Sequence, residues 1–116
     1  MVEKSAAFCH PSKDPSSPAA NMGLLLLCDV ALGKTYDVTK PEYIEKLPEG
    51  THSTHALARY IPDPAKNELG DEEVIIPVGP AIPSGLPDVF LEHGEYVVYN
   101  EAQVKIKYLV HVQFLA

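Results

Sequence analysis

Strict alternation of side chains over residues 104–114 is the feature of this sequence that most constrains its fold. The apolar set consists of Val104, Ile106, Tyr108, Val110, Val112 and Phe114, and the intervening set of Lys105, Lys107, Leu109, His111 and Gln113. Successive side chains of a strand point to opposite faces of a sheet, whereas those of a helix follow a period of 3.6 residues. The pattern therefore predicts a half-buried strand.

The segment 23–33 is a second strand candidate. Its continuous apolar run is bracketed by Gly23 and Gly33 and is too short and unbroken for an amphipathic helix. Such a run is typical of a strand covered on both faces, and we expect a central strand here, although periodicity alone also permits a buried helix. The run contains Asp29 and is shorter than a membrane-spanning helix.

Prolines and glycines divide the remaining chain. We expect a short helix over 2–9 that stops at His10-Pro11, an exposed loop over 11–21, and a short helix over 39–47 capped by Thr39. Residues 51–94 are predicted to be mostly loop, with one short strand at 72–77, and a loop region this long usually carries function. The sum is an α+β chain that is mostly β, with short helices and long connections.

Composition excludes several functional classes. The chain of 116 residues has a formal net charge of −7 and lacks a Lys/Arg cluster, which argues against direct nucleic-acid binding. Neither a membrane span nor a secretion signal is recognisable, so we expect an intracellular protein. Cys9 and Cys28 form no disulfide framework, and we expect both to be free, buried thiols.

The candidate chemistry centres on Glu95, a carboxylate at the start of an apolar and aromatic strand segment, 93–100. Taken alone, this segment favours an edge-strand charge that discourages aggregation. Other motifs are weaker. The histidines and cysteines fit no common zinc spacing, so no metal is expected, and Ser53, His52 and Asp63 lack a nucleophile-elbow sequence. No glycines fall at a phosphate-loop spacing.

Four segments in order carry a resemblance to a known family. They are residues 1–10, residues 23–33, His52-Ser53 leading to Pro62-Asp63-Pro64, and Glu95-Tyr96-Val97-Val98-Tyr99 continuing through Gln103-Val104 to Lys107-Tyr108-Leu109. Together they resemble the C-terminal half of the catalytic domain of poly(ADP-ribose) polymerases, the diphtheria-toxin-like ADP-ribosyltransferases. The resemblance implies a partial, mostly antiparallel ADP-ribosyltransferase fold over residues 1–116, with the upstream part of its NAD pocket absent.

The resemblance also implies roles for individual residues. Glu95 corresponds to the catalytic glutamate, which bonds a ribose hydroxyl of NAD and stabilises the oxocarbenium-like transition state as nicotinamide leaves. Ser5 corresponds to the serine that holds the nicotinamide carboxamide. Phe8 stands where the family has a tyrosine that stacks on the nicotinamide ring, so the ring face is kept and the hydroxyl is lost. Lys4 precedes the serine as in the family and is given only a minor role.

Departures from the family pattern bear on activity. The family's NAD pocket begins with a His-Gly pair and a Gly-x-Tyr-Phe segment upstream of the segments matched here, and neither has a counterpart in these residues. Ala56-Leu57-Ala58 stands where the family has Gly-Leu-Gly. We therefore expect the chain alone to be inactive, open-edged and aggregation-prone, as a fragment or one piece of a split protein.

The resemblance implies an NAD-dependent transferase that modifies acceptor proteins or a growing ADP-ribose chain in the nucleus. From the residues themselves we expect no metal and no direct nucleic-acid or membrane contact. Two alternatives stay open. One is a catalytically silent module of the same fold, and the other is an unrelated small β-rich interaction domain.

Overall fold

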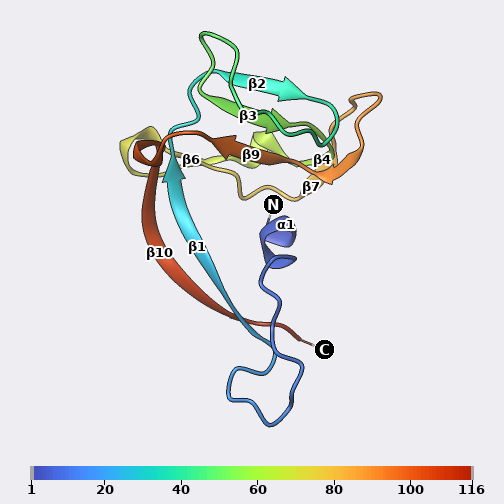
Figure 1. The fold of residues 1–116 in the computed structure, drawn as a ribbon, viewed down its shortest axis with the longest axis vertical. Coiled ribbons are helices and arrows are strands. Elements are labelled where there is room, and N and C mark those ends of the chain that lie inside the picture. Colours follow the sequence, from blue (N-terminus) through green and yellow to red (C-terminus); the bar gives the residue numbers. More distant parts are fainter. Residues whose placement is uncertain (1, 116) are drawn as a thin grey trace.

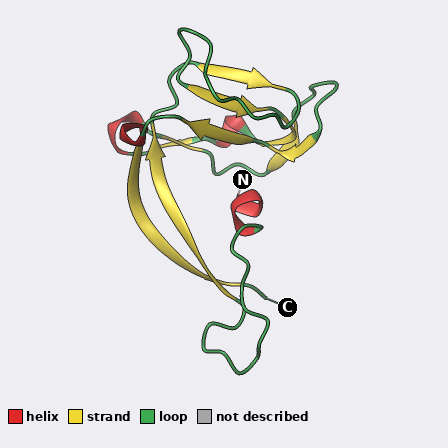
Figure 2. Cartoon of the chain, in the orientation of Figure 1, coloured by secondary structure: helices red, strands yellow, loops and turns green. Residues whose placement is uncertain are grey.

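The computed structural model describes residues 2–115, in which strands greatly outnumber helices (Figures 1 and 2). The strands are β1 (Met22–Val30), β2 (Thr35–Val38), β3 (Ser53–Ala56), β4 (Ala58–Pro62), β5 (Glu68–Leu69), β6 (Ile75–Ile76), β7 (Ala81–Pro83), β8 (Leu91–His93), β9 (Glu95–Val98) and β10 (Val104–Gln113). The helical segments are α1 (Val2–Ala6) and the 3₁₀ turns η1 (Pro64–Lys66), η2 (Asp71–Glu73) and η3 (Glu101–Gln103). The chain is thus mostly β with few helices. None of the described helices has the length and apolar character needed to cross a membrane.

β1 and β10 form a long, twisted antiparallel ribbon that runs away from the other sheets (Figure 1). The two strands predicted at 23–33 and 104–114 are therefore confirmed as strands. Their predicted burial is wrong for the described chain, because Leu26 is 58% and Ile106 61% exposed. Within residues 2–115 the ribbon is a two-stranded sheet, so β1 is not central. Apart from the N-terminal segment beside Gly23, most of its large apolar side chains lack the cover that its composition predicts.

Two three-stranded sheets form the upper part of the molecule in Figure 1. β3 lies between β2, to which it is parallel, and β9, to which it is antiparallel. β4 lies between β7, to which it is antiparallel, and β8, to which it is parallel. Leu57 separates β3 from β4, and Gly94 separates β8 from β9. Two chain segments, β3–β4 and β8–β9, therefore pass directly from one sheet to the other.

The core of the described residues is small and built from small side chains. The buried apolar residues are Val38, Ala56, Ala58 and Val89, with Ser53 and Thr54 as buried polar neighbours. Most of these residues lie on β3 and at the start of β4, so these two strands form the buried centre of the two three-stranded sheets. A core of this size stabilises a chain only weakly, because the free energy from burial scales with the apolar area removed from water.

The helix predicted over 39–47 is wrong, since the described chain has no helical turn there. Two carbonyl groups of this segment accept hydrogen bonds from residues far away in the sequence instead. The Thr39 carbonyl accepts from the Phe90 amide at 3.3 Å, and the Ile44 carbonyl accepts from the Tyr99 hydroxyl at 2.6 Å. Tertiary bonds have replaced the local ones that the capping pattern predicted.

The prediction of a single short strand within residues 51–94 is wrong. This region contains six strands, β3 to β8, each two to five residues long and joined by short connections. The strand predicted at 72–77 is reduced to Ile75–Ile76, after a 3₁₀ turn. The prolines and glycines that suggested loops mark short strand ends in this region.

The N-terminal segment is tied to the ribbon. The helix predicted over 2–9 is confirmed but ends at Ala6, and residues 11–21 form the predicted exposed loop. An added Cβ at Gly23 would lie 3.0 Å from Cys9 Cβ and 2.8 Å from a ring carbon of Phe114, so a side chain at this position would separate the two strands from the N-terminal segment. Cys9 and Cys28 are free, as predicted, but only partly buried.

Candidate active site

Glu95 is the first residue of β9 and lies opposite Ala56 of β3. The preceding residue, Gly94, lets the two backbones approach closely, because an added Cβ there would lie 3.0 Å from the Ala56 carbonyl oxygen. Strand alternation then directs the Glu95 side chain to one face of the sheet and Tyr96 to the other. The position of the carboxylate is therefore set by a short strand next to the buried core.

Gly94→Ala is expected to destabilise the chain by about 1–2 kcal/mol, because the added methyl would press on the backbone of β3. Urea unfolding of the two proteins would measure the difference. Gly70→Ala is the matched control: the nearest atom to its added Cβ is the movable Ile76 Cδ1, at 3.0 Å, and we expect almost no loss of stability. Equal destabilisation by both substitutions would contradict this reason.

Helix α1 places one N-terminal residue, Lys4, beside Glu95. Lys4 Nζ lies 3.5 Å from Glu95 Oε2, with the two side chains 29% and 41% exposed. Ser5 follows Lys4 on the helix, and Phe8 lies in the turn after it, where its amide donates to the Ser5 carbonyl at 3.1 Å. Ser5 and Phe8 are both exposed, Phe8 by 70%. The structure thus brings Lys4 to Glu95, and Ser5 and Phe8 follow Lys4 along the chain.

The Lys4–Glu95 contact is a partly exposed ion pair, and its contribution to stability is small. The contact places the Lys4 ammonium group beside the Glu95 carboxylate at the start of β9. Lys4, for which only a minor role is expected from the sequence, therefore connects α1 to the candidate catalytic strand.

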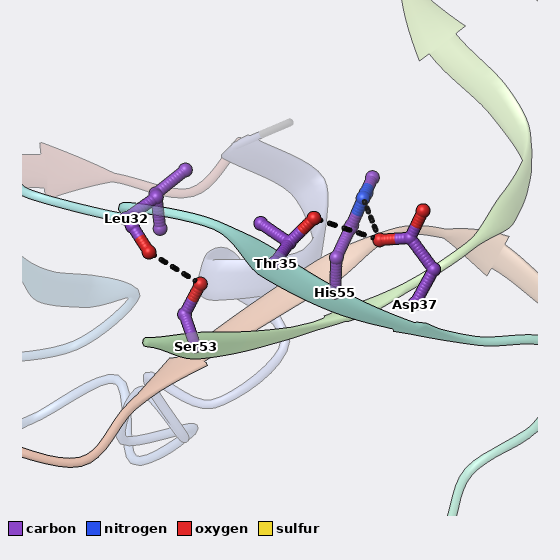
Figure 3. A network of polar contacts seen from close by, with 5 residues as sticks. All are labelled: Leu32, Thr35, Asp37, Ser53 and His55. Carbon is purple, nitrogen blue, oxygen red and sulfur yellow. Dashed lines mark hydrogen bonds and ion pairs between the residues drawn. The ribbon is translucent and has the colours of Figure 1, made fainter. Parts of the chain in front are cut away.

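A second polar network lies on β2 and β3, beside β9. The Thr35 hydroxyl donates to Asp37 Oδ1 at 2.9 Å, and His55 Nδ1 lies 3.5 Å from the same oxygen (Figure 3). The His55 ring stacks on Tyr96 with ring centroids 4.1 Å apart. Burial of Tyr96, with a smaller effect from the Asp37 carboxylate, raises the pKa of its hydroxyl above its usual value. Sequence analysis missed this network because it depends on strand register.

The Gln103 side chain links the ends of three strands, β1, β3 and β9. Its Nε2 donates to the carbonyls of Ala31 and His52, both at 2.9 Å. Its Oε1 accepts from the amides of Tyr99 and Asn100, at 3.3 and 3.0 Å. The side chain therefore holds the end of β1, the start of β3 and the end of β9 together.

The alternative chemistries are not supported by the geometry. Ser53 is completely buried and its hydroxyl donates to the Leu32 carbonyl at 2.8 Å, as Figure 3 shows, so it has no access to a substrate. His52 Nδ1 accepts from the Lys34 amide at 3.0 Å and is not free to act as a base. No group of three or more His, Cys, Asp or Glu side chains within residues 2–115 is placed to hold a metal ion.

Comparison with known proteins identifies the family. The family model described as "Poly(ADP-ribose) polymerase catalytic domain" matches residues 1–114. The chain belongs to this family. It is 43% identical over 115 residues to the "Poly [ADP-ribose] polymerase 1" of Gallus gallus and 41% identical over 115 residues to that of Danio rerio. The "Poly [ADP-ribose] polymerase" of Drosophila melanogaster is 40% identical over 114 residues.

Each of these alignments covers 98% of the chain but only 11% of the relative. The poly(ADP-ribose) polymerase resemblance inferred from the sequence is therefore confirmed at the level of the catalytic-domain family. The match covers both ends of the chain, and so it includes α1 and β9, the two elements that the Lys4–Glu95 contact joins.

Proposed function

We propose that this chain supplies the C-terminal part of an NAD-dependent ADP-ribosyltransferase site, with Glu95 as its catalytic carboxylate and with Ser5 and Phe8 as nicotinamide-binding residues. The observation that carries the proposal is the 3.5 Å contact between Lys4 and Glu95, because it joins the two segments that the resemblance assigns to one site. Membership of the poly(ADP-ribose) polymerase catalytic-domain family supports the reaction class.

In this proposal the Glu95 carboxylate accepts a hydrogen bond from a hydroxyl of the nicotinamide-side ribose. The bond between the ribose C1′ and the nicotinamide nitrogen breaks, and positive charge develops on the ribose. A fixed negative group stabilises that charge most where water is excluded. An acceptor nucleophile then bonds to C1′ and gives up its proton, and Glu95 orients that acceptor when it is a ribose hydroxyl.

Ser5 and Phe8 would hold the leaving group. The Ser5 hydroxyl both donates and accepts hydrogen bonds, so it matches the amide group of nicotinamide. The Phe8 ring offers a large exposed face for stacking, and this contact needs no hydroxyl. The proposal extends to protein acceptors, to growing ADP-ribose chains and to a nuclear location, all of which follow from the resemblance.

Ser5 and Phe8 are exposed on the described surface, and Glu95 is partly exposed. Water therefore reaches the site in the structure, and the electrostatic stabilisation described above is weak in that state. We expect the chain alone to show no turnover of labelled NAD. Turnover by the isolated chain that disappears in Glu95→Gln would contradict this expectation.

A chimeric enzyme tests the proposed function. Residues 1–114 of this chain would replace the matching segment of the Gallus gallus relative, and incorporation of labelled ADP-ribose from NAD would be measured. We expect a rate within about tenfold of the unmodified relative, since a tenfold change corresponds to only about 1.4 kcal/mol in the barrier. A chimera that binds a benzamide mimic of nicotinamide but transfers no ADP-ribose would instead indicate a silent binding module.

A further inference from the structure

We propose that His55 is a positioning residue for Glu95, because its ring stacks on Tyr96, lies close to Gly94 and contacts the Asp37 carboxylate. This inference rests on the function proposed for Glu95. It goes beyond that function by assigning a role to a histidine of the neighbouring strand.

The contact with the residue after Glu95 is a ring stack. His55 and Tyr96 are directly paired across β3 and β9, their centroids lie 4.1 Å apart, and the angle between the ring planes is 13°. Directly paired side chains on adjacent strands form the strongest cross-strand contacts in a sheet. The stack therefore limits rotation and sliding of the start of β9 relative to β3.

The imidazole also lies near the residue before Glu95. A Cβ added to Gly94 would lie 3.6 Å from His55 Nε2, at ordinary van der Waals distance, and 3.0 Å from the Ala56 carbonyl oxygen. The ring therefore stacks on Tyr96 and lies close to Gly94, with Glu95 between these two residues in sequence. Because alternate side chains face opposite sides of the sheet, the ring acts on Glu95 through the backbone and not through its carboxylate.

Asp37 fixes the ring from the strand on the other side. It is paired with His55 in the parallel register of β2 and β3, and its Oδ1 lies 3.5 Å from His55 Nδ1. The Thr35 hydroxyl bonds to the same carboxylate oxygen at 2.9 Å, which limits the rotation of Asp37 (Figure 3). Contacts therefore run from β2 through His55 to both sides of Glu95.

This support matters because Glu95 has little else to hold it. It is the first residue of a four-residue strand, it follows a glycine, and Lys4 is its ion-pair partner in the described chain. A catalytic group must be held within about 0.5 Å of its productive position, and a displacement of about 1 Å can cost a hundredfold in rate. A rigid ring beside both flanking residues supplies such support.

His55→Ala in the chimera tests the positioning role. We expect kcat to fall about tenfold with the KM for NAD almost unchanged, because misplacement of Glu95 affects the transition state more than substrate binding. His55→Phe should restore at least half of kcat, since it keeps the ring beside Gly94 and Tyr96. His111→Ala, at an exposed histidine of β10, is the control and should leave both constants unchanged.

An NMR measurement on this chain itself separates failure of this inference from failure of the proposed function. In His55→Ala the Tyr96 ring signals should move and the nuclear Overhauser contact between the Lys4 and Glu95 side chains should weaken, and His55→Phe should restore both. An inactive chimera with the native segment would reject the proposed function and leave this readout valid. Unchanged Lys4–Glu95 contacts in His55→Ala, or kcat loss equal to that in His111→Ala, would overturn the positioning role.

Discussion

Glu95→Gln in the chimeric enzyme is expected to lower the rate of ADP-ribose transfer by about a hundredfold or more, the scale seen when one preorganised electrostatic group is removed from an active site. Glutamine keeps the size of the side chain and one acceptor oxygen but removes the negative charge. The charge is what stabilises the developing oxocarbenium ion, so the loss should appear in kcat. Binding of a benzamide mimic, measured by thermal shift, should be unchanged because Ser5 and Phe8 are untouched.

Glu92→Gln is the matched control for this substitution. Glu92 lies on β8, three residues before Glu95, and its side chain is exposed. The same change of charge at that position should leave transfer within about twofold, since a solvated charge outside the site is screened by water and salt. Retention of full activity in Glu95→Gln, or equal losses in the two variants, would contradict a catalytic role for Glu95.

Gln103→Ala is expected to cause the largest loss of stability, about 3 kcal/mol, because it removes four hydrogen bonds at once. The carbonyl of Ala31 and the amides of Tyr99 and Asn100 would then depend on water for partners. The substitution also breaks the capping box that begins η3, in which Asn100 and Gln103 bond to each other's backbone. Urea unfolding with an unchanged slope would report the difference in free energy.

Gln113→Ala provides the comparison for that prediction. Gln113 is the last residue of β10 and is exposed, and its removal should change the free energy of unfolding by less than about 0.5 kcal/mol. A loss at Gln103 no greater than at Gln113 would show that the four bonds contribute no net stability. A changed slope would instead indicate that the substitution alters the compactness of the unfolded chain.

The long strands could be predicted because their signal is local. Alternation over 104–114 indicates a strand without reference to the rest of the chain, and the short, glycine-bracketed apolar run at 23–33 favours one over a buried helix. The short strands of the 51–94 region contain too few residues for a side-chain period to be recognised. In the segment 39–47, where a helix is predicted, two carbonyls accept hydrogen bonds from Phe90 and Tyr99 instead of from a helical turn. Local propensity is a weak preference that such tertiary bonds override.

The candidate site, too, has features that the sequence predicts and features that only the tertiary structure shows. Glu95, Ser5 and Phe8 were assigned by their resemblance to family segments, and their roles stay predictions. The stack of His55 on Tyr96 follows from the pairing of β3 with β9, whereas the Lys4–Glu95 contact and the four bonds of Gln103 follow from the tertiary packing. No sequence pattern indicates any of them.

The sequence by itself determined the family, the predominance of strands and the residue types available for chemistry. The tertiary structure alone decided which residues meet. A register shift of one residue would turn every side chain of β9 to the opposite face, so the Lys4–Glu95 contact and the His55–Tyr96 stack exist only because Ala56 pairs with Glu95. That pairing depends on long-range contacts, which are set by the packing of the whole chain.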